Sequence, residues 1–225
     1  MTSRGGTRRR ARKKPVVVLA GEDGNDRRSL RVVLEEVCPQ MRGRIVEIND
    51  PVRLRQASGA NLTARVSRLA RLARARAVRE DAALACVFVH EDLDAVDSEE
   101  YVHTRDRVQK ALEAELGNVH YVLAVWELEA WLLLFPEALT GQVSTWKMPS
   151  KYVGKDTGRL SDPKRIMTRE VAKAPRRYRE SDAPEVFAKA VETGCLARPT
   201  GSNRSWDRLC EDAARCCGRH ITTEV

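Results

Sequence analysis

The sequence predicts a Rossmann-like α/β protein: a mainly parallel sheet flanked by helices, with a small helical appendage at the C-terminus. Two observations predict this class. Short β-branched runs alternate with longer stretches of helical periodicity through the first 135 residues, as in βαβ units. The first run is also apolar throughout, which is consistent with a buried strand, and a β-α-β-α alternation of this length is typical of a mainly parallel sheet covered on both faces.

Each expected element follows from a local pattern. The first run, PVVVLA at 15–20, is followed by an acidic turn, and Asp26 is placed to cap a helix that stops before Pro39. We expect the other strands at 44–48, 83–90 and 119–125, and the other helices at 61–79, 97–116 and 126–135. Prolines and glycines break residues 137–184 into short pieces, and a last helix is expected at 206–217. The expected organisation is a disordered basic tail (1–14), an α/β core (15–135) and a mostly helical appendage (136–225).

The formal charge of +8 is concentrated at the N-terminus. Residues 1–14 carry seven basic side chains and no acid, which leaves about +1 for the rest of the 225 residues. Such a tail can attract nucleic-acid phosphates, or it can be a solubilising leader without a specific partner. The residues that would contact phosphate are Arg8, Arg9, Arg10, Lys13 and Lys14.

Composition also bounds the location of the protein. No segment approaches the roughly 18 apolar residues of a membrane span, and no apolar segment follows the basic start as in a secretory signal. The six cysteines are scattered rather than spaced as in a disulfide scaffold. We therefore expect a cytoplasmic protein with reduced cysteines and no membrane partner.

Charge is unevenly placed in the remainder of the chain. Residues 51–79 hold eight arginines and no acid, residues 80–100 hold eight acids and no lysine or arginine, and residues 147–180 hold eleven basic residues against four acids. This order suggests phosphate-binding surfaces on either side of a metal-binding one, although solvated helix faces would give the same counts. Lysines that could contact a phosphate, or simply lie on the surface, are Lys151, Lys155, Lys164 and Lys189.

Acidic residues follow three of the expected strands. Open parallel sheets place their sites at the carboxyl ends of strands, so these acids should meet. Converging carboxylates repel one another unless a hard divalent cation neutralises them, and two Mg²⁺ or Mn²⁺ ions can activate water for phosphodiester hydrolysis. Exposed acidic loops or helix caps would explain each group separately, and the i, i+2 spacing keeps the last two acids off one helical face. The candidates are Glu22 and Asp26, Asp92 and Asp94, and Glu127 and Glu129.

This succession resembles the TOPRIM family. The acidic turn after the first strand, Asp92-x-Asp94 and Glu127-x-Glu129-Ala-Trp-Leu-Leu are similar to stand-alone bacterial TOPRIM-like families of unsettled function, several of them linked to phage defence. The resemblance covers roughly residues 15–135 and includes the domains of overcoming-lysogenization-defect nucleases. It implies that Glu22, Asp92 and Asp94 bind Mg²⁺. Because the order here is Gly21-Glu22 rather than Glu-Gly, the acid–base role falls to either Glu22 or Asp26.

Three functions are consistent with these residues. The first is a metal-dependent nuclease acting on DNA or RNA, for which phage defence is one setting. The second is a non-catalytic nucleic-acid-binding or sensor subunit that works with a partner such as an ATPase, and the third is a phosphatase or nucleotide hydrolase. No P-loop or Gly-x-Ser-x-Gly elbow is present, and we expect no zinc site because the cysteines near the C-terminus lack a CxxC pair (Cys210, Cys216, Cys217, with His220).

Overall fold

The structure is a computed structural model that describes residues 13–221. It confirms the α/β class: four parallel strands form one sheet in the order β2-β1-β3-β4. Arg8, Arg9 and Arg10 lie outside the described residues. The strands are β1 (Pro15–Ala20), β2 (Ile45–Glu47), β3 (Ala83–Asp92) and β4 (Val119–Ala124).

Eight α-helices are found among residues 13–221, with short 3₁₀ and π-helical turns between them. They are α1 (Gly24–Val37), α2 (Gly59–Arg79), α3 (Glu99–Leu116), α4 (Leu128–Leu132), α5 (Pro136–Gln142), α6 (Pro163–Arg165), α7 (Ala183–Glu192) and α8 (Arg204–Cys216).

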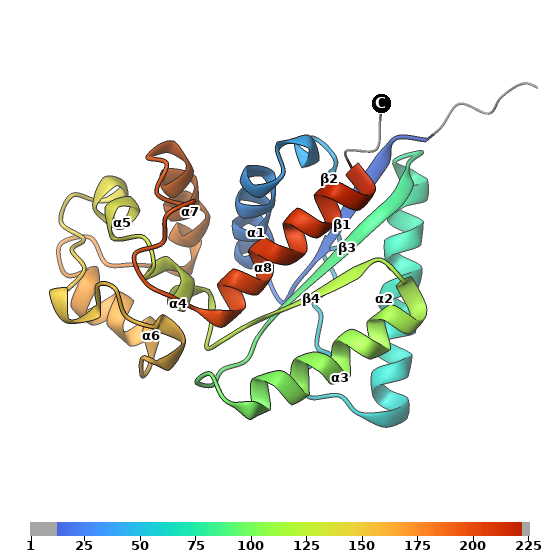
Figure 1. Ribbon diagram of the computed structural model, residues 1–225, viewed down its shortest axis with the longest axis horizontal. Coiled ribbons are helices and arrows are strands. Elements are labelled where there is room, and N and C mark those ends of the chain that lie inside the picture. Colours follow the sequence, from blue (N-terminus) through green and yellow to red (C-terminus); the bar gives the residue numbers. More distant parts are fainter. Residues whose placement is uncertain (1–12, 222–225) are drawn as a thin grey trace, which may run out of the picture.

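Helices cover both faces of the sheet (Figure 1). Helices α2 and α3 pack on one face, whereas α1 and α8 pack on the other, and α4 to α7 gather beyond the carboxyl ends of the strands. One apolar cluster joins β1 and β3 to residues from α1, α4, α5, α7 and α8, and a second lies between the sheet and α2 and α3. The C-terminal third of the chain therefore shares its core with the sheet.

Two element boundaries differ from the sequence prediction, and both affect the site. Strand β3 runs to Asp92, two residues further than expected, because it pairs with β4 up to Ala124. The helix expected at 126–135 begins only at Leu128 and ends at Leu132. Its start is delayed because Trp126 adopts a left-handed backbone with φ +60°.

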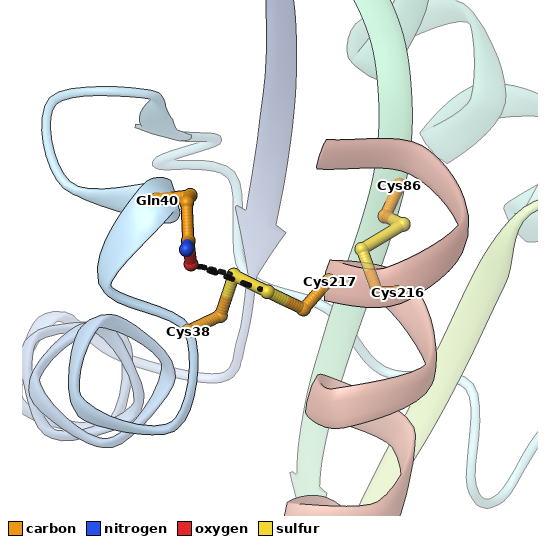
Figure 2. The surroundings of a disulfide bond; sticks show 5 residues. All are labelled: Cys38, Gln40, Cys86, Cys216 and Cys217. Carbon is orange, nitrogen blue, oxygen red and sulfur yellow. Dashed lines mark hydrogen bonds between the residues drawn. A yellow bond between two sulfur atoms is a disulfide. The ribbon is translucent and has the colours of Figure 1, made fainter. Parts of the chain in front are cut away.

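Four of the six cysteines are paired, which corrects the expectation of reduced thiols. Cys38, at the end of α1, bonds to Cys217, and Cys86 of β3 bonds to Cys216. Figure 2 shows that the two adjacent cysteines at the end of α8 bond to different partners: Cys217 to Cys38 and Cys216 to Cys86. The sequence could not show this pairing because the partners lie 179 and 130 residues apart.

The helices give no indication of a membrane span. Within residues 13–221, no helix is long and apolar enough to cross a bilayer.

Candidate functional site

A cleft with a volume of about 280 Å³ lies at the carboxyl ends of β1 and β3. Four of the six acids expected at strand ends line this cleft: Glu22, Asp26, Asp92 and Glu129. Asp23 and Glu180 add two further carboxylates, and Arg53 and Lys164 are the only cations among its lining residues. The cleft is therefore strongly acidic, as the strand-end argument predicts.

The turn after β1 supplies two of these acids. Asp23 caps α1 by accepting hydrogen bonds from the backbone N–H groups of Asn25 (2.6 Å) and Asp26 (2.9 Å). The Asp26 carboxylate accepts in return from the backbone N–H of Asp23 at 3.3 Å, which completes a capping box. Asp23, rather than Asp26, is thus the cap, and the capping box fixes the position of Asp26.

Glu22 reaches from the same turn to the end of β3. Its carboxylate accepts a hydrogen bond from the backbone N–H of Asp92 at 3.3 Å. Partial burial and the nearby charge of Glu91 raise the pKa of Glu22. The first and third strand ends are therefore joined directly through Glu22.

His90 lies behind the cleft, fully buried in β3. Its ring nitrogens are each 3.6 Å from a carboxylate oxygen, Nδ1 from Asp26 and Nε2 from Asp92, and neither has a hydrogen-bond partner among the described residues. Burial alone would lower the pKa of His90, but Asp26 and then Asp92 and Glu22 raise it to about 9. A protonated His90 would thus offset part of the negative charge of the cleft.

Asp92 is the least compensated of these acids. Its Oδ1 atom is buried and has no hydrogen-bond partner in the described part of the chain. Burial, and to a lesser extent the charges of Asp26 and Glu129, raise the pKa of Asp92 well above its usual value, against the opposing effect of His90. Asp92 Oδ1 faces His90 Nε2 at 3.6 Å, and a carboxylate that lines an acidic cleft with a histidine as its nearby cation is a suitable ligand for a divalent cation.

Glu129 enters the cleft from the first turn of α4. It is 4% exposed, and its carboxylate accepts a hydrogen bond from the Tyr178 hydroxyl at 3.0 Å. Burial, followed by the charge of Glu127, raises the pKa of Glu129 to about 7. Tyr178 and Glu180 were missed by sequence reasoning, since they lie in the segment after Pro149 where periodicity is weak and carry no motif.

Asp94 and Glu127 do not line the cleft. Asp94 itself adopts a left-handed backbone (φ +56°) and pairs with the guanidinium of Arg55 at 2.5 Å. Glu127 accepts a hydrogen bond from the backbone N–H of Lys164 at 3.0 Å and lies 3.7 Å from its ammonium group. Of the Asp92-x-Asp94 and Glu127-x-Glu129 pairs, the structure brings only Asp92 and Glu129 into the cleft.

The candidate basic residues are divided. Lys164 lines the cleft, and its ammonium group pairs with Glu180. Lys155 is exposed, Lys189 pairs with Glu192 on α7, Lys151 pairs with Glu170, and Lys13 pairs with Asp81, all away from the cleft. Lys14 is exposed just before β1.

The spacing of the cleft carboxylates fits divalent ions that keep several bound waters better than an ion held by carboxylates alone. Among residues 13–221, no three of the cleft carboxylates bring ligand atoms within 4.8 Å of one another. Mg²⁺ commonly binds through one or two carboxylates and retains several waters, for which a cleft of about 280 Å³ has room. Glu22, Asp92 and Glu129, with Asp26 behind them, are the residues that would hold such ions.

A second group of possible ligands lies at the opposite end of the sheet. The ligand atoms of Cys86, His120 and Cys216 lie within 4.8 Å of one another. Because the two sulfurs form a disulfide, they are not thiolates that could bind zinc. The cysteines near the C-terminus do not form one group of thiols: Cys210 is unpaired, and Cys216 and Cys217 belong to different disulfides.

Comparisons with known proteins do not assign the cleft. No protein-family model matches the chain, and neither a curated protein nor a solved structure matches it. The function is therefore inferred from the residues of the cleft and their surroundings.

Proposed function

We propose that the protein is a TOPRIM-like, Mg²⁺- or Mn²⁺-dependent phosphodiester hydrolase acting on nucleic acid. The observation that carries the proposal is the convergence of Glu22, Asp92 and Glu129, from three different strand ends, on one acidic cleft. The burial of Glu129, the partial burial of Asp92 and the mutual repulsion of the three carboxylates make a divalent cation the natural counter-charge. Bound divalent ions would supply an activated water and stabilise the leaving oxygen.

The protein residues have distinct parts in this proposal. Asp92 and Glu129 hold the ions, and Tyr178 fixes the Glu129 carboxylate through its hydroxyl. Glu22 is the more exposed acid, placed to accept or return a proton. Lys164 and Arg53 are placed to contact the phosphate oxygens of the substrate.

Cleavage assays test the proposal. Plasmid DNA, single-stranded DNA and RNA are incubated with the protein in Mg²⁺, in Mn²⁺ and in EDTA, and free nucleotides and small phosphate esters are assayed in parallel. We expect metal-dependent cleavage of nucleic acid that Asp92→Ala reduces at least 100-fold. The matched variant Asp94→Ala, which removes a carboxylate outside the cleft, should retain most of the activity. Equal cleavage by wild type and Asp92→Ala would sink the assigned site.

A non-catalytic nucleic-acid-binding or sensor subunit is the second candidate. It is favoured by the Gly21-Glu22 order and by the engagement of Glu22 with the Asp92 backbone. This function predicts salt-sensitive binding of nucleic acid without cleavage in any metal. Preferential hydrolysis of nucleotides or phosphate esters would instead indicate a small-molecule phosphatase.

A further inference from the structure

A second hollow adjoins the acidic cleft and carries the opposite charge. It is a groove of about 340 Å³ between the loop Asp50–Leu54 and the N-terminal half of α2. Arg53 lines both the groove and the cleft, so the two hollows adjoin at this residue. The charged residues of the groove are Arg53, Arg65, Arg68 and Asp50.

Buried contacts hold the loop of the groove in place. The Glu91 carboxylate, 2% exposed, accepts hydrogen bonds from the backbone N–H groups of Leu54 (2.8 Å) and Arg55 (3.1 Å), and from the Tyr121 hydroxyl (2.9 Å). The guanidinium of Arg65 donates to the carbonyl oxygen of Arg53. The groove is therefore a preformed surface rather than a mobile loop.

The three arginine side chains are exposed, although the guanidinium of Arg65 also donates from Nε to Asn61 at 2.9 Å. Arg68 pairs with Asp50 at 3.1 Å, but these side chains are 67% and 50% exposed, and ion pairs so exposed contribute little free energy. Three arginines against one aspartate leave the groove with an excess of positive charge. In the cleft, six carboxylates face two cations. A polyanion is therefore attracted to the groove and repelled by the metal-free cleft.

The groove also has an apolar side. Val52, Leu54 and Leu69 are nearly buried in its wall, and Leu72 is partly exposed there. These side chains are nearly buried and aliphatic, so they form the floor of the groove rather than a platform for stacked bases. What the groove shares with proteins that bind single strands is a positively charged track that follows the backbone. That track favours a single strand.

We propose that this groove binds the backbone of single-stranded nucleic acid and leads it past Arg53 into the acidic cleft. Delivery of the strand to the cleft rests on the proposed function, whereas binding of the strand to the groove needs no metal. Arg65 and Arg68 contact phosphates, and Arg53 marks the point at which the strand enters the cleft.

Fluorescence anisotropy in EDTA tests this binding with the full chain. The probes are labelled single-stranded DNA and RNA of one sequence, and the matching duplex. We expect Arg65→Gln, Arg68→Gln to weaken single-strand binding roughly tenfold or more. The slope of log K against log salt should fall by about 1.4, since each lost phosphate contact removes about 0.7 for single strands.

Two variants control for charge and folding. Arg79→Gln removes one arginine charge from the far end of α2, about 21 Å along the helix from Arg65, and should bind as wild type does. Asp50→Asn removes the one acid of the groove and should tighten binding severalfold. Unchanged melting temperatures would show that the variants are folded.

The outcomes separate the groove from the hydrolase. Wild-type binding by the double variant, or equal losses in the double variant and Arg79→Gln, would overturn the groove. Tighter, groove-dependent binding of the duplex would overturn the choice of a single strand. Groove-dependent binding without metal-dependent cleavage would support the groove and refute the hydrolase. Metal-dependent cleavage that the double variant leaves unchanged would support the hydrolase and refute the groove.

Discussion

At the scale of single residues, the cleft contains more carboxylates than its neighbouring cations can neutralise. Asp92 has a buried oxygen without a hydrogen-bond partner in the described chain, and only His90 offsets its charge. Such a group lowers the stability of the metal-free protein, and it is retained where function requires it. We therefore expect Asp92 to lower the stability of the metal-free protein and to be required for metal binding.

Replacing Asp92 by asparagine tests this trade. In EDTA near neutral pH, Asp92→Asn should raise the melting temperature by a few degrees, since 1 kcal/mol corresponds to about 2–4 °C for a domain of this size. The rise in melting temperature that Mg²⁺ or Mn²⁺ gives the wild type should be lost in the variant. Thermal unfolding with and without metal measures both effects.

Asp94→Asn is the matched control because its carboxylate pairs with Arg55 outside the cleft. It should keep the metal-induced rise. An Asp92→Asn protein that is still stabilised by metal, or an Asp94→Asn protein that is not, would contradict the assignment.

Residue identity could be predicted from sequence only in part. The acids at the strand ends were visible because each follows an apolar run, and Glu22, Asp26, Asp92 and Glu129 do meet. The left-handed turns at Asp94 and Trp126 have no sequence signal of their own, yet they decide which member of each acidic pair enters the cleft. Tyr178 could not be predicted because its contact with Glu129 spans 49 residues.

At the scale of elements, α8 is the segment that ties the end of the chain to the sheet. At its start, the Ser205 hydroxyl accepts hydrogen bonds from the backbone N–H of Val125 (2.9 Å) and from the indole N–H of Trp131 (2.8 Å). At its end, two disulfides join it to β3 and to the end of α1. The helix thus supports β4 and α4, the elements that carry Glu129 to the cleft.

Reduction should therefore destabilise the protein. Each disulfide closes a long loop, and the loss of a native disulfide typically costs about 2–4 kcal/mol. We expect a strong reductant to lower the denaturant midpoint of the wild type. The Cys216→Ser, Cys217→Ser variant should already be less stable and should not respond to reductant.

Cys210→Ser is the matched control, since Cys210 is an unpaired thiol on the same helix. It should respond to reductant as the wild type does. Identical midpoints for oxidised and reduced wild type would show that the paired cysteines do not hold α8 in solution.

A buried aspartate gives α8 a defined pH dependence. Burial alone would raise the pKa of Asp212, but His120 at 3.4 Å and then Arg208 at 3.3 Å lower it. The folded pKa lies below the unfolded value of about 3.9, so the stabilisation is fully present above that value and is lost as pH falls through the folded pKa. We expect Asp212→Asn to be less stable than wild type by about 3 kcal/mol at pH 7.

Melting temperatures between pH 7 and pH 3 measure this effect. The difference between wild type and Asp212→Asn should persist down to about pH 4 and shrink below it. A constant difference down to pH 3, or no difference at pH 7, would refute the assigned role of Asp212.

Elements were more predictable than their ends. The four strands lie where apolar β-branched runs predicted them, because burial on both faces leaves a strong sequence signal. The helix expected at 126–135 covers only Leu128–Leu132 in the structure. Residues 133–135 are also buried in the core, but outside the helix, so their apolar character did not indicate a helix. Short apolar segments carry no periodicity that distinguishes these cases.

At the scale of the whole molecule, charge is arranged around the carboxyl ends of the strands. The acidic cleft opens there and the basic groove along α2 adjoins it at Arg53. Residues of α4, α6 and the segment 178–183 line the other side of the cleft, in the part of the molecule where α4 to α7 gather beyond the strands (Figure 1). The net charge of +8 therefore says less about binding than the placement of the charges does. A parallel sheet brings these segments together because all its strands end at one edge.

The central claim is that this cleft binds divalent metal. Anomalous diffraction from crystals grown with MnCl₂ tests it most directly, because the signal locates Mn²⁺ independently of any enzymatic assay. We predict one or two anomalous peaks in the cleft, with Asp92 and Glu129 among the ligands and Asp94 absent from them. A cleft without an anomalous peak in crystals containing Mn²⁺, or peaks only outside it, would contradict the claim.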